Sequence, residues 1–121
     1  MFSEKELDNI KREMSKLKNE VVLKLFTDFK IQEDGSKLRK CMACEGAYEL
    51  LKTLEEYSDG KLTIEEVSTE ENEEEAEKYN VSRIPAILFV DNDGKEIIRY
   101  LAHPTGSEFV PFLISIQIFQ E

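Results

Sequence analysis

Two cysteines carry the chemistry that this sequence offers. Cys41 and Cys44, the only cysteines among 121 residues, stand at the first turn of a predicted helix, after a predicted strand. The N–H groups and dipole of a helix N-terminus favour a thiolate at Cys41, and Arg39 and Lys40 add positive charge there. Cys44 follows on the same side of the turn, more enclosed and within disulfide range. The pattern predicts thiol–disulfide exchange, in which Cys41 attacks and Cys44 resolves.

Two other interpretations of the cysteine pair stay open. One is half of a zinc site, but zinc takes four ligands, and the chain adds only the distant His103 to the two cysteines. Such a site would need a second chain. The other is a pair of inert structural cysteines, which the charged neighbours of Cys41 disfavour. We favour redox chemistry, which needs neither a metal nor an organic cofactor.

Helical and extended patterns alternate in the first half of the chain. An extra N-terminal helix is predicted within residues 1–20, where Ser3 and Glu6 have capping-box spacing. A strand at Val21–Phe29 leads through a polar loop at Lys30–Lys40 into the helix that starts at the cysteines. Asp28, near the end of that strand, is taken as an ordinary exposed carboxylate and left outside the site.

The second half predicts the remaining sheet and two helices. The expected elements are a strand at Lys61–Val67, an acidic helix capped by Ser68 and Glu71, hairpin strands at Ala86–Val90 and Lys95–Leu101, and a last helix capped by Ser107. The first two strands, joined by a helical crossover, must be parallel, whereas the hairpin is antiparallel. We therefore predict an α/β fold in the order α-β-α-β-α-β-β-α, with a four-stranded mixed sheet flanked by helices.

The charge balance narrows the classes of partner. There are 26 Asp and Glu against 16 Lys and Arg, a formal net charge of −10, which repels nucleic-acid phosphates and anionic lipids. We interpret the acidic run Glu65–Glu77 as a solvated helix face. No apolar run approaches the roughly 20 residues of a membrane span, and the acidic start is unlike a signal peptide. We expect one cytoplasmic domain, residues 1–121, with neither nucleic-acid nor membrane partners.

The last helix is apolar on two sides. One side carries Phe109, Phe112, Leu113 and Ile116, and the other carries Val110, Ile114 and Ile118. Only one of these sides can face the sheet of the same domain. The second side predicts contact with a second unit or with a twin chain.

Several motifs together resemble a known family. Cys41-Met42-Ala43-Cys44 at a helix start, and Arg83-Ile84-Pro85 before a hairpin and a closing helix, resemble thioredoxin-fold proteins over Val21–Phe119. The segment Arg99–Phe109 and the extra first helix are similar to the N-terminal unit of the glutaredoxin-like protein disulfide oxidoreductases of thermophiles. Two such units follow one another in those proteins. This chain has the length of one unit, alone or as a fragment.

The resemblance implies further features of the site and its partners. It implies a cis Ile84–Pro85 bond that faces the cysteines, with the Ile84 backbone pairing with an extended substrate segment. From the residues alone, Pro85 could simply start a strand, because only about 5% of X–Pro bonds are cis. Protein dithiols and disulfides are the implied substrates, served by a thiol or flavoprotein reductant. The alternative is an interaction or electron-relay module whose cysteines are structural, share zinc across a dimer or serve one partner enzyme.

Overall fold

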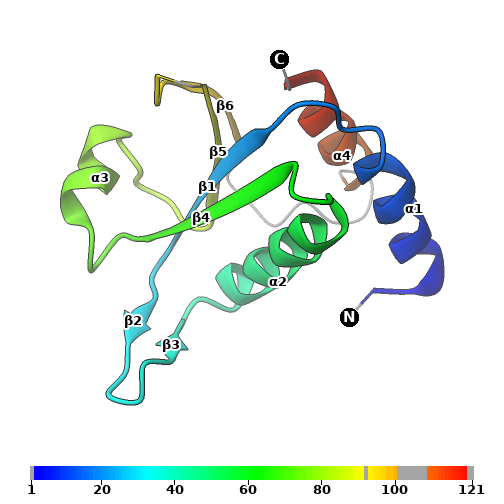
Figure 1. The fold of residues 1–121 in the computed structure, drawn as a ribbon. Coiled ribbons are helices and arrows are strands. Elements are labelled where there is room, and N and C mark those ends of the chain that lie inside the picture. The colour runs from blue at the N-terminus through cyan, green and yellow to red at the C-terminus, as the bar shows by residue number, and fades with distance from the viewer. Residues whose placement is uncertain (1, 92, 101–108, 120–121) are drawn as a thin grey trace.

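The chain folds into a sheet with helices on both faces, as a computed structural model shows for residues 2–91, 93–100 and 109–119 (Figure 1). None of the helices in these ranges is long and apolar enough to cross a membrane. The elements in order are α1 (Glu4–Met14), β1 (Val21–Thr27), β2 (Lys30–Ile31), β3 (Lys37–Leu38), α2 (Met42–Tyr57), β4 (Leu62–Ser68), α3 (Glu73–Lys78), β5 (Ala86–Val90), β6 (Glu96–Tyr100) and α4 (Phe109–Phe119).

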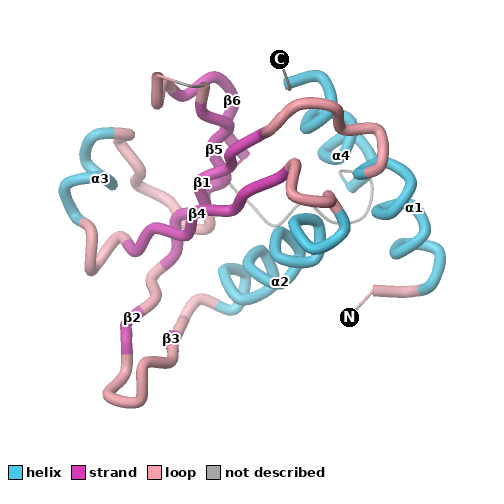
Figure 2. Tube along the Cα trace, viewed as in Figure 1, coloured by secondary structure: helices cyan, strands magenta, loops and turns pink. Residues whose placement is uncertain are grey.

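The main sheet has four strands in the order β4-β1-β5-β6 (Figure 2). β1 pairs in parallel with β4, from Val21 opposite Leu62 to Thr27 opposite Ser68. β5 runs antiparallel to both β1 and β6, with a register shift between Phe89 and Val90. The predicted mixed sheet is therefore confirmed, with one parallel pair and the hairpin at the other edge.

Alternation along the strands divides the core into two layers. Leu23 and Leu25 of β1 lie in the larger cluster, where α1, α2 and α4 cover one face of the sheet. Phe26 lies in the smaller cluster on the opposite face, which Ala76 of the short α3 and Tyr79, directly after that helix, cover. Figure 1 shows α3 alone on one side of the sheet and the three longer helices on the other. The cysteine helix therefore belongs to the better covered face.

The N-terminal helix begins as the sequence predicts. The Ser3 hydroxyl accepts the N–H of Glu6 at 3.1 Å, and the Glu6 carboxylate accepts the N–H of Ser3 at 2.9 Å, which completes the capping box. Buried Ile10 and Met14 attach the helix to the core, and α1 ends at Met14.

Two local expectations are wrong. Lys30–Lys40 is not a plain loop, because β2 and β3 form a small hairpin. Asp34 closes its turn by accepting the N–H of Ser36, and Gly35 adopts a φ of +87° there.

Ser68 does not cap the acidic helix. Its hydroxyl accepts the N–H groups of Glu70 and Glu71 in a preceding turn, and α3 starts only at Glu73. The predicted cap Ser107 lies outside the described residues.

Replacement of Phe112 should test the packing of α4. Its buried ring meets Phe89 and Tyr100 edge to face, with centroids 6.0 and 5.0 Å away. We expect Phe112→Ala to lower the free energy of unfolding by about 3–5 kcal/mol, because it leaves a cavity. The control Ile114→Ala, on the same helix but 43% exposed, should cost less than about 1 kcal/mol. Equal losses in denaturant unfolding would contradict this orientation of α4.

Candidate active site

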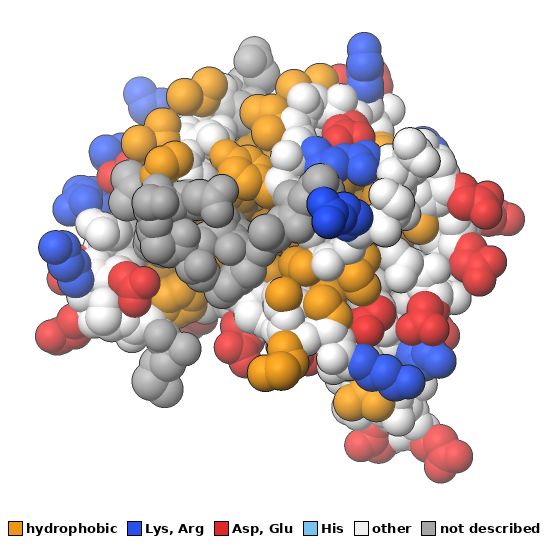
Figure 3. Space-filling model, turned by 180° about the vertical axis from the view of Figure 1, so that it is seen from behind, with side chains coloured by type: hydrophobic (Ala, Val, Ile, Leu, Met, Phe, Trp, Pro, Cys, Tyr) orange, Lys and Arg blue, Asp and Glu red, His pale blue; other side chains and the backbone are white. Residues whose placement is uncertain are grey.

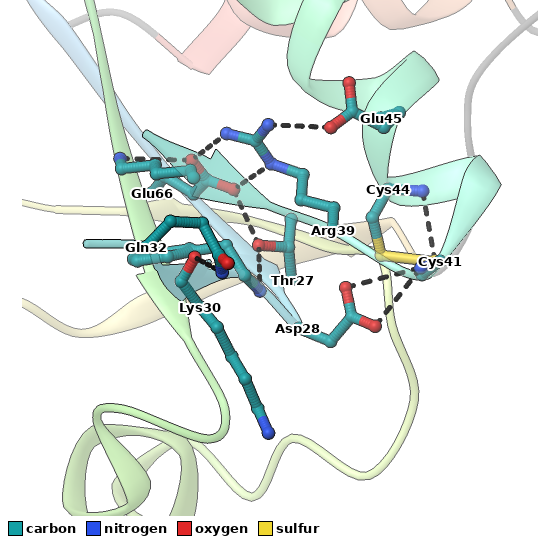
Figure 4. A network of polar contacts seen from close by, with 11 residues as sticks. Thr27, Asp28, Lys30, Gln32, Arg39, Cys41, Cys44, Glu45 and Glu66 are labelled. Atoms are coloured by element: carbon teal, nitrogen blue, oxygen red, sulfur yellow. Dashed lines mark hydrogen bonds and ion pairs between the residues drawn. A yellow bond between two sulfur atoms is a disulfide. The ribbon is translucent and has the colours of Figure 1, made fainter. Parts of the chain in front are cut away.

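The two cysteines form a disulfide at the start of α2 (Figure 4). Cys41 is the N-cap residue, with extended backbone, and Cys44 lies in the first turn, with the two Cα atoms 5.1 Å apart. The Cys44 N–H points at the sulfur of Cys41, 3.1 Å away. Cys44 is fully buried, whereas Cys41 is partly exposed. A molecule from solvent can therefore reach Cys41, as the sequence predicts, and not Cys44.

Asp28 is a member of the site that the sequence analysis left out. Its carboxylate accepts the backbone N–H of Cys41, with the nearer oxygen 3.1 Å away. Asp28 is half-buried, so the expectation of an ordinary exposed carboxylate is wrong. The chain between the two residues folds back through the β2–β3 hairpin, which brings them together. The available signal was an acid near the end of a buried strand, on the chain that leads to the crossover helix.

Arg39 turns away from the cysteines into a buried ion pair. Its Nε and Nη2 atoms each donate to Glu66 at 2.6 Å, and Nη1 donates to Glu45 at 2.9 Å. Its guanidinium lies over the Tyr48 ring, 3.9 Å from the centroid. Two carboxylates neutralise this cation, so the expectation that Arg39 lends its charge to Cys41 is wrong. Arg39 instead fixes the chain two residues before the cysteine.

Glu66 is the buried end of this network, with a side chain that is only 3% exposed. It also accepts the Thr27 hydroxyl at 2.6 Å and the Lys37 ammonium at 3.3 Å. Burial alone would raise the pKa of Glu66, but hydrogen bonds from Arg39 and Thr27 outweigh it and hold the pKa below 4.5. For Glu66, the interpretation of the acidic run as a solvated helix face is wrong, because this residue lies on β4 and points toward α2.

The Ile84–Pro85 peptide bond is cis, as the family resemblance implies. Pro85 is buried and directly precedes β5, whose first residue, Ala86, pairs with Phe26 of β1. The cis bond therefore lies at the end of β1 from which Asp28 follows. A contact between Ile84 or Pro85 and a substrate stays a prediction.

Comparison with known proteins identifies the family. The sequence matches the Thioredoxin family over residues 6–114. This chain belongs to the thioredoxin family. The comparison with curated protein sequences returned no match. A Cys41–Cys44 disulfide on a thioredoxin fold supports thiol–disulfide oxidoreductase chemistry at this site. Across the described part of the chain, no three His, Cys, Asp or Glu side chains gather as metal ligands.

Solved structures share the fold at low sequence identity. A protein disulfide oxidoreductase from Aeropyrum pernix matches with a TM-score of 0.74 and 21% identity, over 95% of this chain and 46% of its own. The alkylhydroperoxide reductase AhpF from Enterococcus faecalis gives 0.77 and 17%, over 99% and 53%. Fasciola hepatica thioredoxin gives 0.62 and 20%, over 91% and 90%. The chain spans about half the length of the first two.

Replacement of Glu66 should show what the buried ion pair contributes. We expect Glu66→Gln to lower the free energy of unfolding by about 3–5 kcal/mol, because Arg39 keeps its charge without a full partner in a buried place. The control is Glu65→Gln on the same strand. Glu65 is also ion-paired, to Lys24 at 2.7 Å, but its side chain is 54% exposed, so the loss should stay below about 1 kcal/mol.

Acid should narrow the difference in stability between wild type and Glu66→Gln. The folded state lowers the pKa of Glu66, so its contribution to stability is complete above its ordinary value of 4.5 and is lost as the pH falls through the lower folded-state pKa. Denaturant unfolding at pH 7 and at a series of acid pH values measures this. A difference that is small at pH 7, or that grows in acid, would contradict the assignment.

Proposed function

We propose that the protein is a thiol:disulfide oxidoreductase that exchanges disulfides with protein substrates through the Cys41–Cys44 dithiol. One observation carries this proposal: a partly exposed cysteine at a helix N-cap is bonded to a fully buried cysteine in the first turn of the same helix. That asymmetry separates an attacking sulfur from a resolving one. The thioredoxin fold and the protein disulfide oxidoreductase among its structural neighbours support it.

The proposed exchange has two steps. The Cys41 thiolate attacks one sulfur of a substrate disulfide; that S–S bond breaks, the other substrate sulfur leaves as a thiolate, and a mixed disulfide forms. The Cys44 thiolate then attacks the Cys41 sulfur and releases the second substrate thiol, which leaves the Cys41–Cys44 disulfide. Two electrons have passed to the substrate. The reverse sequence oxidises a substrate dithiol, and an external thiol or flavoprotein reductant restores the reduced protein.

Ile84 and Pro85 are proposed to hold the substrate segment during these steps. The position of Pro85 supports this, because it lies at the end of β1 that also leads, through Asp28, to the backbone of Cys41. The Ile84 backbone would pair with an extended segment on one side of the substrate cysteine. Cytoplasmic localisation remains part of the proposal, because thiols stay reduced there.

A dedicated electron relay is the second candidate. The similarity in fold to the alkylhydroperoxide reductase AhpF supports it. The dithiol chemistry would be the same, but one partner enzyme would be the substrate. Turnover of an unrelated disulfide-bonded protein distinguishes the two candidates. A general oxidoreductase turns it over readily, whereas a dedicated relay reacts with it poorly.

The reduction potential of the cysteine pair tests the proposal directly. Equilibration in graded thiol buffers, followed by alkylation and mass counting, should give a two-electron transition between dithiol and disulfide. A value near about −270 mV would indicate a reductase, and one above about −200 mV an oxidant or isomerase. If no Cys41–Cys44 disulfide forms at any ratio of thiol to disulfide, the redox proposal fails. A structural or zinc-sharing role then replaces it, and metal analysis of the purified protein would detect the zinc.

Single cysteine variants should separate the two roles. We expect Cys44→Ser to accumulate a mixed disulfide with protein substrates at Cys41, because nothing resolves it. Cys41→Ser should accumulate none, since the remaining sulfur is buried. Non-reducing gels and mass spectrometry measure the adducts. Equal trapping by both variants would contradict the assigned roles.

A second thioredoxin-fold unit is the proposed partner of α4. Ile114 is 43% exposed and Ile118 is 74% exposed on its outer side. Ile118 also borders a groove of about 710 Å³ that includes Val22, Val90 and Ile97. In the two longer neighbours the match covers only about half of the chain, which leaves room for a further unit beside this fold.

Self-association should therefore appear at high concentration. Without a fused unit, a second copy of this chain should occupy the outer side of α4, and light scattering should show a mass that rises with concentration. The variant Ile118→Glu should remain monomeric, because it places a charge in the contact. A wild-type monomer at high concentration that also binds no apolar dye would contradict the proposal.

A further inference from the structure

Arg39 and Glu45 stand on either side of the cysteine pair in the sequence, and their side chains meet. Arg39 lies two residues before Cys41, and Glu45 directly follows Cys44. The Nη1 atom of Arg39 donates to the Glu45 carboxylate at 2.9 Å, as Figure 4 shows. The segment 39–45 is therefore a loop of chain that contains both cysteines and is closed by a side-chain contact.

Arg39 is a firm anchor for this contact. Its Nε and Nη2 atoms donate to Glu66, whose side chain is only 3% exposed. Its guanidinium also lies over the ring of Tyr48, which follows Glu45 on α2 by three residues. Figure 3 shows Lys, Arg, Asp and Glu side chains at the surface of one face of the protein, whereas the Arg39 side chain is only 6% exposed. A planar guanidinium held by three side chains has little freedom to move.

The contact reaches the part of the site that depends most on the disulfide. Cys41 is the N-cap residue, so its backbone is extended and lies outside the regular helix. The first turn is bonded to it by the N–H groups of Cys44 and Glu45, which donate to the Cys41 carbonyl at 3.1 and 3.2 Å. Helix ends fray, and reduction removes the covalent link between the two sulfurs. Non-covalent contacts alone must then hold the N-cap against the first turn.

We propose that Arg39 and Glu45 are positioning residues that keep the two sulfurs close together after the disulfide has been reduced. We call their contact, with Glu66 as its buried anchor, the Arg39–Glu45 clamp. The inference rests on the proposed function and concerns its second step, in which the Cys44 thiolate attacks the Cys41 sulfur. A group held beside its target reacts as if it were present at a very high concentration. The clamp therefore raises the effective concentration of one thiol at the other.

Position, rather than charge, is what the clamp contributes. Glu45 and Glu66 neutralise Arg39, so this cation does not favour a thiolate at Cys41. The Glu45 carboxylate, by its charge alone, disfavours a nearby thiolate. Loss of that charge would therefore assist the attack by Cys41 in the first step. Loss of the clamp would instead impair the second step, which needs both sulfurs in place.

Equilibrium with glutathione measures the clamp. The protein dithiol and one oxidised glutathione give the Cys41–Cys44 disulfide and two reduced glutathiones, and the equilibrium constant has the units of a concentration. Glu45→Ala should lower this constant about threefold, the size of effect that a partly exposed ion pair supplies. The Glu45 side chain is 44% exposed, so its removal leaves the buried pair of Arg39 with Glu66 intact.

Arg39→Lys should have the larger effect. Lysine keeps the positive charge that Glu66 needs, but a single ammonium lacks the planar fork that holds Glu66 and Glu45 together. We expect the equilibrium constant to fall about tenfold, which raises the reduction potential by about 30 mV. The same alkylation and mass counting measure both variants.

The first step alone shows whether the attack by Cys41 has changed. In Cys44→Ser the exchange with oxidised glutathione stops at the mixed disulfide, with one reduced glutathione released. Adding Glu45→Ala to this variant should leave the equilibrium constant of the first step within about twofold, because Cys44 takes no part in it. A fall in this constant as large as the fall in the complete exchange would overturn the inference.

Two matched variants separate the contact from the charge. Glu49→Ala makes the same change one turn further along α2, where the side chain is exposed, and should keep the wild-type constant. Glu45→Gln removes the charge but keeps an oxygen that accepts from Arg39, so it should stay closer to wild type than Glu45→Ala does. Equal constants for Glu49→Ala and Glu45→Ala, or for Glu45→Gln and Glu45→Ala, would overturn the inference.

Failure of the clamp and failure of the proposed function look different. If wild type and Glu45→Ala form the disulfide with the same constant, the clamp is overturned and the function stands. If the constants differ as expected but wild type does not turn over protein disulfides, the function fails and the clamp stands. If wild type forms no Cys41–Cys44 disulfide at any ratio of thiol to disulfide, both are overturned.

Discussion

The buried ion pair between Arg39 and Glu66 is the interaction on which the site depends. The chain leaves the sheet after Thr27 and must return to the same place to start α2. A buried charge pair costs desolvation, which is offset only with close geometry and with every other donor and acceptor satisfied. Thr27, Lys37 and Glu45 supply those contacts. Because few other arrangements satisfy these charges, the return path of the chain is fixed, and Cys41 with it.

Strand directions explain why the site forms at one edge of the sheet. β1 and β4 are parallel, so their carboxyl ends lie together, and β5 is antiparallel to β1, so its amino end lies beside them. Asp28 follows β1, Glu66 lies near the end of β4, and Pro85 precedes β5. Residues far apart in the sequence meet there for a topological reason. α2, the helix in the crossover from β1 to β4, begins at the same edge and carries the cysteines at its N-terminal end.

The arrangement also gives the two sulfurs different surroundings. The N-cap position leaves Cys41 partly open to solvent, whereas Cys44, in the first turn of α2, is fully buried. The whole chain has a formal net charge of −10, yet the charges beside the cysteines are mixed, because Arg39 and Lys37 face Glu66 and Glu45. Access to solvent and local packing, rather than the overall charge, therefore distinguish the two sulfurs.

Local patterns in the sequence determined the elements: the capping box at Ser3, the buried runs of β1 and β5, and the helix that starts at the cysteines. These depend on neighbours a few residues apart, which propensity and periodicity describe. The hairpin within Lys30–Lys40, the contact of Asp28 with Cys41 and the burial of Glu66 were decided only by the tertiary structure. The contacts of Asp28 and Glu66 join residues 13 or more positions apart, and the hairpin depends on the turn that brings the chain back. A sequence pattern shows that a residue is charged, but it does not show which distant group that residue meets.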